Sequence, residues 1–357
     1  MDLTDRPTGI IWDVTYACPL RCTHCYSESG RRSPKHVSHA DMLRIADALT
    51  SLRPFMITLA GGEPLVLQRI TEVGEHIAQA GIPVLIYTSG WSLRSSVVPE
   101  LARVFLQTVV SVDGATADVH DRIRGRAGSF DRAMKALTML ENEAARRAVT
   151  GEAPLRYGID YTVVRSNFRQ VEEFCVGIAG RFPHLSSVSF GVAVPSGLAN
   201  RTSYTEHELL TDAEVDQIDD PALVARLRSL APNSIEIRTS TNRELQMHPD
   251  DIAATPDFRP LQVEPDGQVR AMPIYEGTVG SLLVEDPAVL WNRAQARWHD
   301  PFVVDTLRPA RTMAEWAAAA RRIDQHFGSA ESRTRIAQRP AFLPLTPVPV
   351  SADSIAG

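Results

Sequence analysis

The sequence has few cysteines, and it has no long apolar run. Its 357 residues contain four cysteines, of which three lie within eight positions and the fourth, Cys175, stands alone. A disulfide framework would distribute its cysteines along the chain, so we interpret the group of three as a metal site. No run of about eighteen apolar residues is present, and residues 1–10 lack the basic and apolar regions of a signal peptide. These absences predict a cytoplasmic protein with no membrane association.

Positive charge is scarce and is carried almost entirely by arginine. The chain has 37 Lys and Arg against 43 Asp and Glu, for a formal net charge of −6, and only Lys35 and Lys135 are lysines. An acidic chain offers no general electrostatic attraction for a nucleic-acid backbone. We therefore expect no nucleic-acid partner.

The 44% of hydrophobic residues is ample for a globular core.

Short β-rich runs alternate with amphipathic helical stretches from residue 9 to about residue 195. This alternation predicts parallel βα units, which form a full or partial barrel or a doubly wound open sheet; the periodicity favours none of these. In each case the chemistry lies at the carboxyl ends of the strands. The predicted strands are 9–15, 55–60, 83–88, 108–113, 156–164 and 187–194, and the predicted helices are 39–52, 66–80, 93–104, 129–147 and 168–181.

The pattern changes after about residue 200. Thr211 and Glu214 have the spacing of a helix start, and residues 261–263 and 268–271 flank a turn at 264–267 that predicts a hairpin. Residues 311–327 form an alanine-rich helical stretch. The proline-rich segment 339–357 lacks periodicity and is predicted to be disordered.

Cys18, Cys22 and Cys25 follow the spacing C-x3-C-x2-C directly after the first predicted strand. Thiolates suit both iron–sulfur clusters and zinc. Three thiolates on a four-iron cluster leave one iron free for an exchangeable ligand, whereas a structural zinc site needs a fourth protein ligand. His24, His36 and His39 are the candidates for that fourth ligand, and the spacing alone does not decide between the two metals.

Small residues at the ends of the following strands favour the cluster. Gly61, Gly62 and Glu63 end the second predicted strand, and residues 88–90 and 111–114 end the next two. Glycines allow a ligand to approach the backbone, and Glu63 offers a carboxylate to a cationic group, although an ordinary glycine turn has the same pattern. A lone zinc site would not need such residues at three consecutive strand ends.

The cysteine motif, with His24 before its last cysteine and Gly-Gly-Glu-Pro downstream, resembles the radical S-adenosylmethionine (SAM) superfamily. The resemblance implies a partial (β/α)6 barrel of parallel strands over residues 9–200, one [4Fe–4S] cluster and bound SAM. It also implies an external electron donor of the flavodoxin or ferredoxin type. The implied roles are cluster ligation by Cys18, Cys22 and Cys25, contact with the SAM amino group by Gly61, Gly62 and Glu63, and further SAM contacts by Ser89, Ser111 and Arg124, for which Arg122 and Arg126 are alternatives.

The second half resembles the SPASM and twitch domains that accompany such barrels. The turn at 264–267 matches the hairpin after which those domains carry a cysteine, but Met272 stands near that position and no cysteine follows Cys175. An auxiliary cluster needs thiolates. We therefore expect residues 201–330 to form a small α+β twitch-like region without a cluster, or else an unrelated hairpin and helix.

These features predict a radical SAM enzyme that acts on a natural product, either a sugar-, aminocyclitol- or nucleoside-like molecule or a ribosomal peptide. The lack of an auxiliary cluster favours redox-neutral or simple abstraction chemistry such as epimerisation, rearrangement or decarboxylation. The alternatives are an oxidative peptide maturase that works with a separate recognition protein, and a non-catalytic zinc-binding interaction protein. Cys175 is a candidate hydrogen donor or a buried core residue. Candidates to line the substrate pocket are Tyr157, Asp160, Tyr161 and Tyr275.

Overall fold

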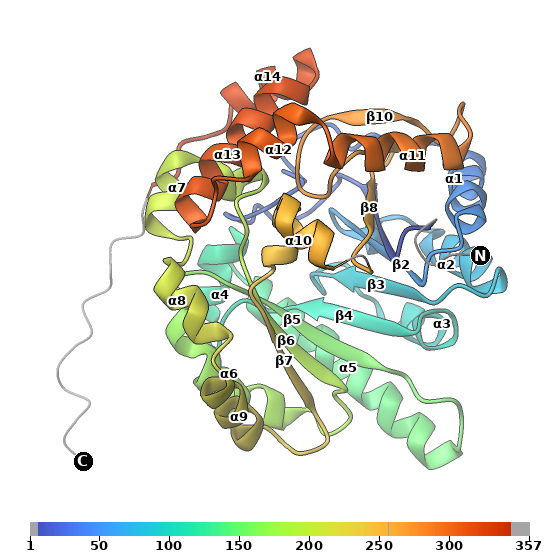
Figure 1. The fold of residues 1–357 in the computed structure, drawn as a ribbon. Helices are drawn as coiled ribbons and strands as arrows, with labels where there is room; N and C mark the ends of the chain where they lie inside the picture. The colour runs from blue at the N-terminus through green and yellow to red at the C-terminus, as the bar shows by residue number, and fades with distance from the viewer. Residues whose placement is uncertain (1–5, 256, 344–357) are drawn as a thin grey trace.

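One ten-stranded sheet organises the chain. The computed structural model describes residues 6–255 and 257–343, and its strands follow the spatial order β10-β9-β8-β1-β2-β3-β4-β5-β6-β7 (Figure 1). The strands are β1 (Gly9–Thr15), β2 (Met56–Gly61), β3 (Val84–Thr88), β4 (Gln107–Ser111), β5 (Tyr157–Val163), β6 (Ser187–Val192), β7 (Glu236–Ser240), β8 (Pro260–Val263), β9 (Gln268–Arg270) and β10 (Thr278–Ser281).

Strands β1 to β7 are parallel in chain order, and β8 pairs in parallel with the other edge of β1. Strands β9 and β10 then continue the sheet antiparallel. Because all eight parallel strands point the same way, their carboxyl ends meet on one side of the molecule. The mixed α/β fold with a curved, mainly parallel sheet confirms the predicted partial-barrel class.

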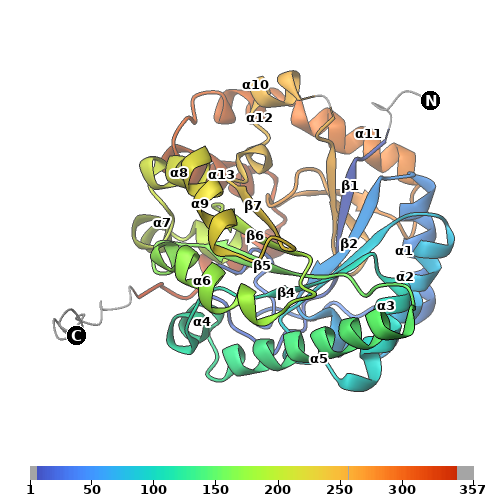
Figure 2. The same ribbon diagram turned by 90° about the horizontal axis from the view of Figure 1, so that it is seen from below.

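Helices cover the outer face of the curved sheet, as Figure 2 shows for α1, α3, α5 and α6. In the part of the chain that the structure describes, no helix is both long and apolar enough to cross a membrane. The α-helices are α1 (His39–Ser51), α2 (Ile70–Gln79), α3 (Val98–Val104), α4 (Ala117–Arg124), α5 (Ser129–Thr150), α6 (Val171–Gly177), α7 (Thr202–His207), α8 (Asp212–Ile218), α9 (Pro221–Leu230), α10 (Pro249–Ala254), α11 (Pro287–Trp298), α12 (Pro301–Leu307), α13 (Met313–Phe327) and α14 (Ala330–Ala337).

Alternation along the strands separates the core from the site. On β2, Ile57 and Leu59 are completely buried, whereas Thr58 and Ala60 line the central cavity. Successive side chains of a strand point to opposite faces, so one face packs under the helices and the other faces the barrel interior. The outer face packs the strands against the helices, while the inner face carries the side chains that line the cavity.

All six predicted strands are present, together with the hairpin of β8 and β9 and the capping box of Thr211 and Glu214 that begins α8. Strand β7 and helix α4 were not predicted. On β7 only Ile237 is buried among charged or half-buried neighbours, so its apolar pattern is weak. Helix α4 has 8 residues, too few for a clear helical periodicity.

The first residues of the segment that was predicted to be disordered are packed instead. Arg339 forms an ion pair with Glu28, and the ring of Phe342, which is 7% exposed, lies 4.8 Å from that of Tyr204. Residues 344–357 of this segment lie outside the described residues. The packed part of the chain therefore extends to at least Phe342.

Candidate active site

The cysteines lie on a loop that follows β1. The N–H of Gly30 donates to the carbonyl of Tyr16 at 2.7 Å, so the loop returns to its starting point. Cys18, Cys22 and Cys25 are free thiols, and all three line one cavity. The loop therefore presents three sulfur ligands to the same space at the carboxyl end of the barrel.

Each cysteine sulfur has a neighbouring hydrogen-bond donor. The pairs are the Leu20 N–H with Cys18 Sγ at 3.4 Å, Arg124 Nη1 with Cys22 Sγ at 4.0 Å, and Ser27 Oγ with Cys25 Sγ at 3.6 Å. Burial nevertheless raises the pKa of the Cys22 thiol to about 11, and burial raises the pKa of Cys18 as well. A metal cation is what stabilises thiolates in such a site, and an iron–sulfur cluster supplies one. The residues present fit a cluster held by three cysteines.

A single zinc ion fits this arrangement less well. Within residues 6–255 and 257–343, no three Cys, His, Asp or Glu side chains converge closely enough to hold one metal ion. Of the predicted fourth ligands, His24 lines the cavity, but its Nε2 lies 2.9 Å from Asp113 Oδ2. His39 pairs with Glu72, and neither His36 nor His39 lines the cavity.

Gly61, the last residue of β2, and the following Gly62 allow the end of that strand to pack closely against the cysteine loop. The N–H of Gly62 donates to the Thr15 carbonyl at 2.7 Å. A Cβ on Gly62 would lie 2.3 Å from the Ala17 carbonyl oxygen, and Gly61 has φ of +104°. Both glycines also line the cavity. Their absent side chains thus permit the close loop packing as well as access to the backbone from the cavity.

Glu63 does not line the cavity; its completely buried carboxylate joins the ends of β2 and β3. It accepts hydrogen bonds from Thr88 Oγ1 at 2.7 Å, from the Ser89 N–H at 2.9 Å, from the Ser89 hydroxyl and from the Leu65 N–H at 3.2 Å. Burial raises the pKa of Glu63 despite these donors. The expected contact with SAM stays a prediction, because the described donors already occupy this carboxylate.

Asp113, just after β4, links the cysteine loop to α4. Its Oδ2 lies 2.9 Å from His24 Nε2 and 2.6 Å from Arg124 Nε, and its Oδ1 accepts from the Thr162 N–H at 2.9 Å. Burial alone would raise the pKa of Asp113, but Arg124 and His24 outweigh it and hold that pKa well below its usual range. Arg124 thereby reaches both Asp113 and Cys22 from α4.

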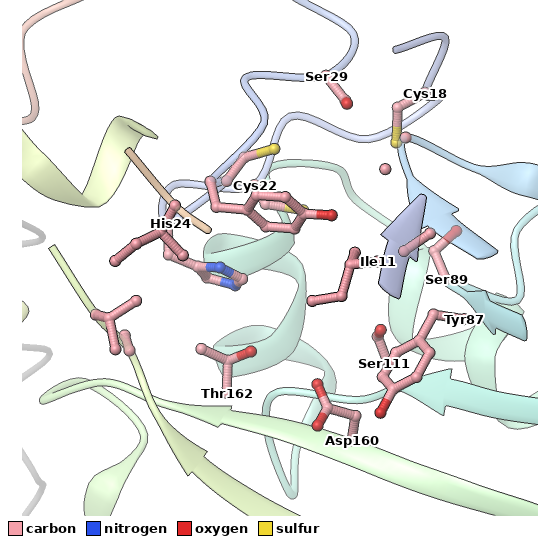
Figure 3. A pocket seen from close by; sticks show the side chains of 18 of the residues that line it. Ile11, Cys18, Cys22, His24, Ser29, Tyr87, Ser89, Ser111, Asp160 and Thr162 are labelled. Atoms are coloured by element: carbon pink, nitrogen blue, oxygen red, sulfur yellow. The ribbon is translucent and has the colours of Figure 1, made fainter. Parts of the chain in front are cut away.

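The cavity has a volume of about 420 Å³ and lies inside the barrel (Figure 3). Ser89, Ser111 and Arg124 line it, as the sequence predicted for SAM contacts, while Arg122 and Arg126 do not. Arg126 instead stacks on Trp91, with its guanidinium carbon 3.8 Å from the ring centre. Of the three arginines in this segment, the geometry selects Arg124.

Several predicted residues are not brought to the cavity. Cys175 lies completely buried in the apolar core on α6 and does not line the cavity, and burial raises its pKa to about 12. This position favours the core alternative, and a role as hydrogen donor stays a prediction. Of the four pocket candidates only Asp160 lines the cavity; Tyr157, Tyr161 and Tyr275 are at most 1% exposed and do not line it.

Two structural residues of the site were not predicted: Tyr26, which pairs with Asp13, and Asp113, which pairs with His24. The Tyr26 hydroxyl donates to Asp13 Oδ1 at 2.6 Å, and Gln262 Nε2, on β8, donates to Asp13 Oδ2 at 3.0 Å. Asp113 follows a strand end, which is a usable signal, but its partner His24 is 89 positions away. Only the folded chain reveals these pairs.

The chain resembles known proteins mainly over its first half. The family model of the radical SAM superfamily matches residues 12–161. Mycofactocin maturase MftC of Mycolicibacterium smegmatis is 34% identical over 179 residues, which are 50% of this chain and 43% of that protein. The AdoMet-dependent heme synthase of Methanosarcina barkeri is 29% identical over 171 residues, or 47% of this chain and 46% of that one. The chain thus matches less than half the length of either relative.

The whole fold resembles solved structures of that superfamily. Streptococcus suis SuiB bound to S-adenosylmethionine superposes with a TM-score of 0.62 at 16% identity, covering 83% of this chain and 67% of SuiB. The same protein has also been solved with its precursor peptide SuiA. At this identity the likeness concerns the fold, which includes the region after residue 200.

Proposed function

Because the chain belongs to the radical SAM superfamily, we propose that it cleaves SAM reductively and abstracts hydrogen from a natural-product substrate. The observation that carries the proposal is the set of three free thiols on one loop, which share a cavity with the inner strand ends. A [4Fe–4S] cluster held there by Cys18, Cys22 and Cys25 would supply the electron for reductive cleavage of the C5′–S bond of SAM.

The chain's own residues bind and orient the reactants. Cys18, Cys22 and Cys25 hold the cluster, and the exposed backbone of Gly61 and Gly62 receives the SAM amino group. Arg124 is fixed by Asp113 and is the cation available to the SAM carboxylate. Ser89 and Ser111 are the hydroxyls available to SAM on β3 and β4. The surrounding strands and helices exclude bulk water from the radical.

The proposed reaction class is redox-neutral or simple abstraction chemistry in the maturation of a peptide or another natural product. No cysteine follows Cys175, so residues 201–330, proposed as a twitch-like region, lack thiolates for an auxiliary cluster. Oxidative peptide crosslinking with a separate recognition protein is the second candidate. The likeness in fold to SuiB, which has been solved with its precursor peptide, favours a peptide substrate.

An external flavodoxin- or ferredoxin-type protein is proposed to deliver the electron in the cytoplasm. Arg21, Arg31 and Arg126 are exposed and donate to backbone carbonyls of the loop at residues 18–21. Within the described part of the chain none of the three has a carboxylate partner. Uncompensated positive charge beside the cluster loop of an acidic protein suits an acidic donor protein.

The first experiment tests the cofactor and SAM cleavage. Anaerobically reconstituted protein should contain about four irons and release 5′-deoxyadenosine from SAM under dithionite. Alanine at Cys18, Cys22 or Cys25 should abolish both properties, and the triple variant should retain no iron. One zinc per chain would overturn the proposal, and a full cluster in the triple variant would overturn the assignment of these ligands.

The second experiment tests the electron donor. Replacing Arg21, Arg31 and Arg126 together by Gln should slow cluster reduction by reduced flavodoxin about tenfold at low salt, while reduction by dithionite is unchanged. Equal rates for the variant and wild type would remove this surface from the proposal. The matched control is Gln at Arg94, Arg156 and Arg308, which are also exposed.

A further inference from the structure

Asp160 is a carboxylate on the inner face of β5 that lines the cavity. In the sheet register it lies beside Ser111 on β4 and Ser189 on β6. Figure 3 shows its side chain at the opposite end of the cavity from Cys18 and Cys22. The acid therefore faces the part of the cavity that is remote from the cluster ligands.

Asp160 differs from the other carboxylates around the cavity because it has no hydrogen-bond or ion-pair partner among the described residues. Each of the others is held by at least two donors. Those donors are His24 and Arg124 for Asp113, Tyr26 and Gln262 for Asp13, and Thr88 and Ser89 for Glu63. Asp160 is half-buried, and its carboxylate lines the cavity without a partner in the described part of the chain, so it is free to pair with a ligand there.

The electrostatic surroundings of Asp160 agree with an unpaired acid. The pKa of Asp160 is raised to about 6: burial raises it most, the negative charge of Asp113 raises it too, and Arg124 only partly offsets both. The pKa of Tyr87 on β3 is also raised, mainly by burial and further by the negative charge of Asp160. Since Arg124 is bound to Asp113, it does not neutralise Asp160 directly.

Much of the surface that lines the cavity is apolar. Its apolar side chains include Ile11, Ala60, Val192, Leu245 and Ile274. An apolar chamber with one carboxylate selects a ligand with an apolar body and a single cationic group, because a charge-assisted hydrogen bond is the strongest contact that such an acid can make.

We propose that Asp160 binds a protonated amine of the substrate and thereby orients the substrate in the cavity. The proposal rests on the proposed function, since it assigns the substrate end of the same cavity. SAM also carries positive charge, but its methionine end is assigned to the cysteine loop and to Gly61 and Gly62. The substrate class is therefore an amine-bearing molecule, which includes a peptide with a free amino group and an amino sugar.

The test uses benzylamine and benzyl alcohol as probes, because they have the same shape and differ in charge. Their binding to the reconstituted protein with SAM present is measured by ligand-observed NMR at pH 7.5. Wild type should bind benzylamine at least tenfold more tightly than benzyl alcohol, and Asp160→Asn should remove that preference. Asp160→Glu should keep part of it. Asp118→Asn, at an exposed acid on α4, is the control for a general charge effect.

The outcomes separate this proposal from the proposed function. Wild type that forms 5′-deoxyadenosine yet binds the two probes equally would overturn the amine site and leave the function intact. An Asp160→Asn variant that loses SAM affinity but keeps its preference for the amine would overturn it too, because Asp160 would then contact SAM. Absence of both cluster and SAM cleavage in wild type would instead refute the function.

Discussion

The two ends of the cavity differ in how completely their polar groups are paired. At the loop end, Asp113 is held by His24 and Arg124. At the strand end, Asp160 has no partner among the described residues and its pKa is raised to about 6. The loop end is therefore preorganised by the protein alone, as a resident cofactor site requires, whereas the strand end is completed only by a ligand.

The largest expected effect is at the loop end. Asp113→Asn removes the partner of a buried arginine, and loss of one member of a buried ion pair costs about 3–5 kcal/mol of unfolding free energy. Urea denaturation of the apoprotein measures it. Asp118→Asn, in an exposed pair with Arg122, should cost less than about 1 kcal/mol. Equal effects at Asp113 and Asp118 would mean that the loop end is no better organised than the surface.

Glu63 offers a sharper test of preorganisation. Glu63→Ala leaves the Ser89 and Thr88 donors without an acceptor inside the protein, so the unfolding free energy should fall by about 2–4 kcal/mol. SAM affinity should fall as well, since Ser89 loses its anchor. Normal stability with a tenfold or greater loss of SAM affinity would show that Glu63 contacts SAM directly, contrary to its position in this structure.

At the strand end the expected effect has the opposite sign. The native pKa of Asp160 lies above the ordinary value of 3.8, so the folded state binds the extra proton and loses stability as the pH rises from about 4 to about 6. Above pH 6 the unpaired charge costs about 1–3 kcal/mol. Asp160→Asn should therefore stabilise the apoprotein at pH 8, and the gain should shrink towards pH 4.5. A lower stability of the Asp160→Asn apoprotein than of wild type at pH 8 would show that Asp160 has a stabilising partner within the protein.

The smallest effect is expected at Cys175, which lies in the core and outside both ends of the cavity. Cys175→Ala should cost about 1 kcal/mol of stability and leave product formation unchanged. The measurement is product formation by the variant once a substrate is known, with 5′-deoxyadenosine release as the control. Release of 5′-deoxyadenosine without product would show that Cys175 takes part in the reaction, contrary to its buried position outside the cavity.

The fold was predictable where the pattern is local. Alternating strands and helices, the turn at residues 264–267 and the capping box at Thr211 all depend on neighbouring residues. The parallel pairing of β8 with β1 was not predictable, because Gly9 and Pro260 meet only through the folded sheet. Similarly, the cysteine motif indicated which thiols share the cavity, whereas the orientation of Glu63 depends on Thr88 and Ser89, which lie 25 and 26 positions away.

The ion pairs of Glu28 have a consequence for the order of assembly in the cell. This residue follows the last cluster cysteine in left-handed conformation, with φ of 54°, and its carboxylate is held by Arg335 and Arg339. Arg339 is 311 positions away from it. At ribosomal rates of about 5–20 residues per second, about 15–60 s separate the synthesis of these two partners. In a nascent chain the three thiols are therefore present before Arg335 and Arg339 can pair with Glu28. We expect stable cluster insertion after translation of α14 rather than during synthesis of the barrel.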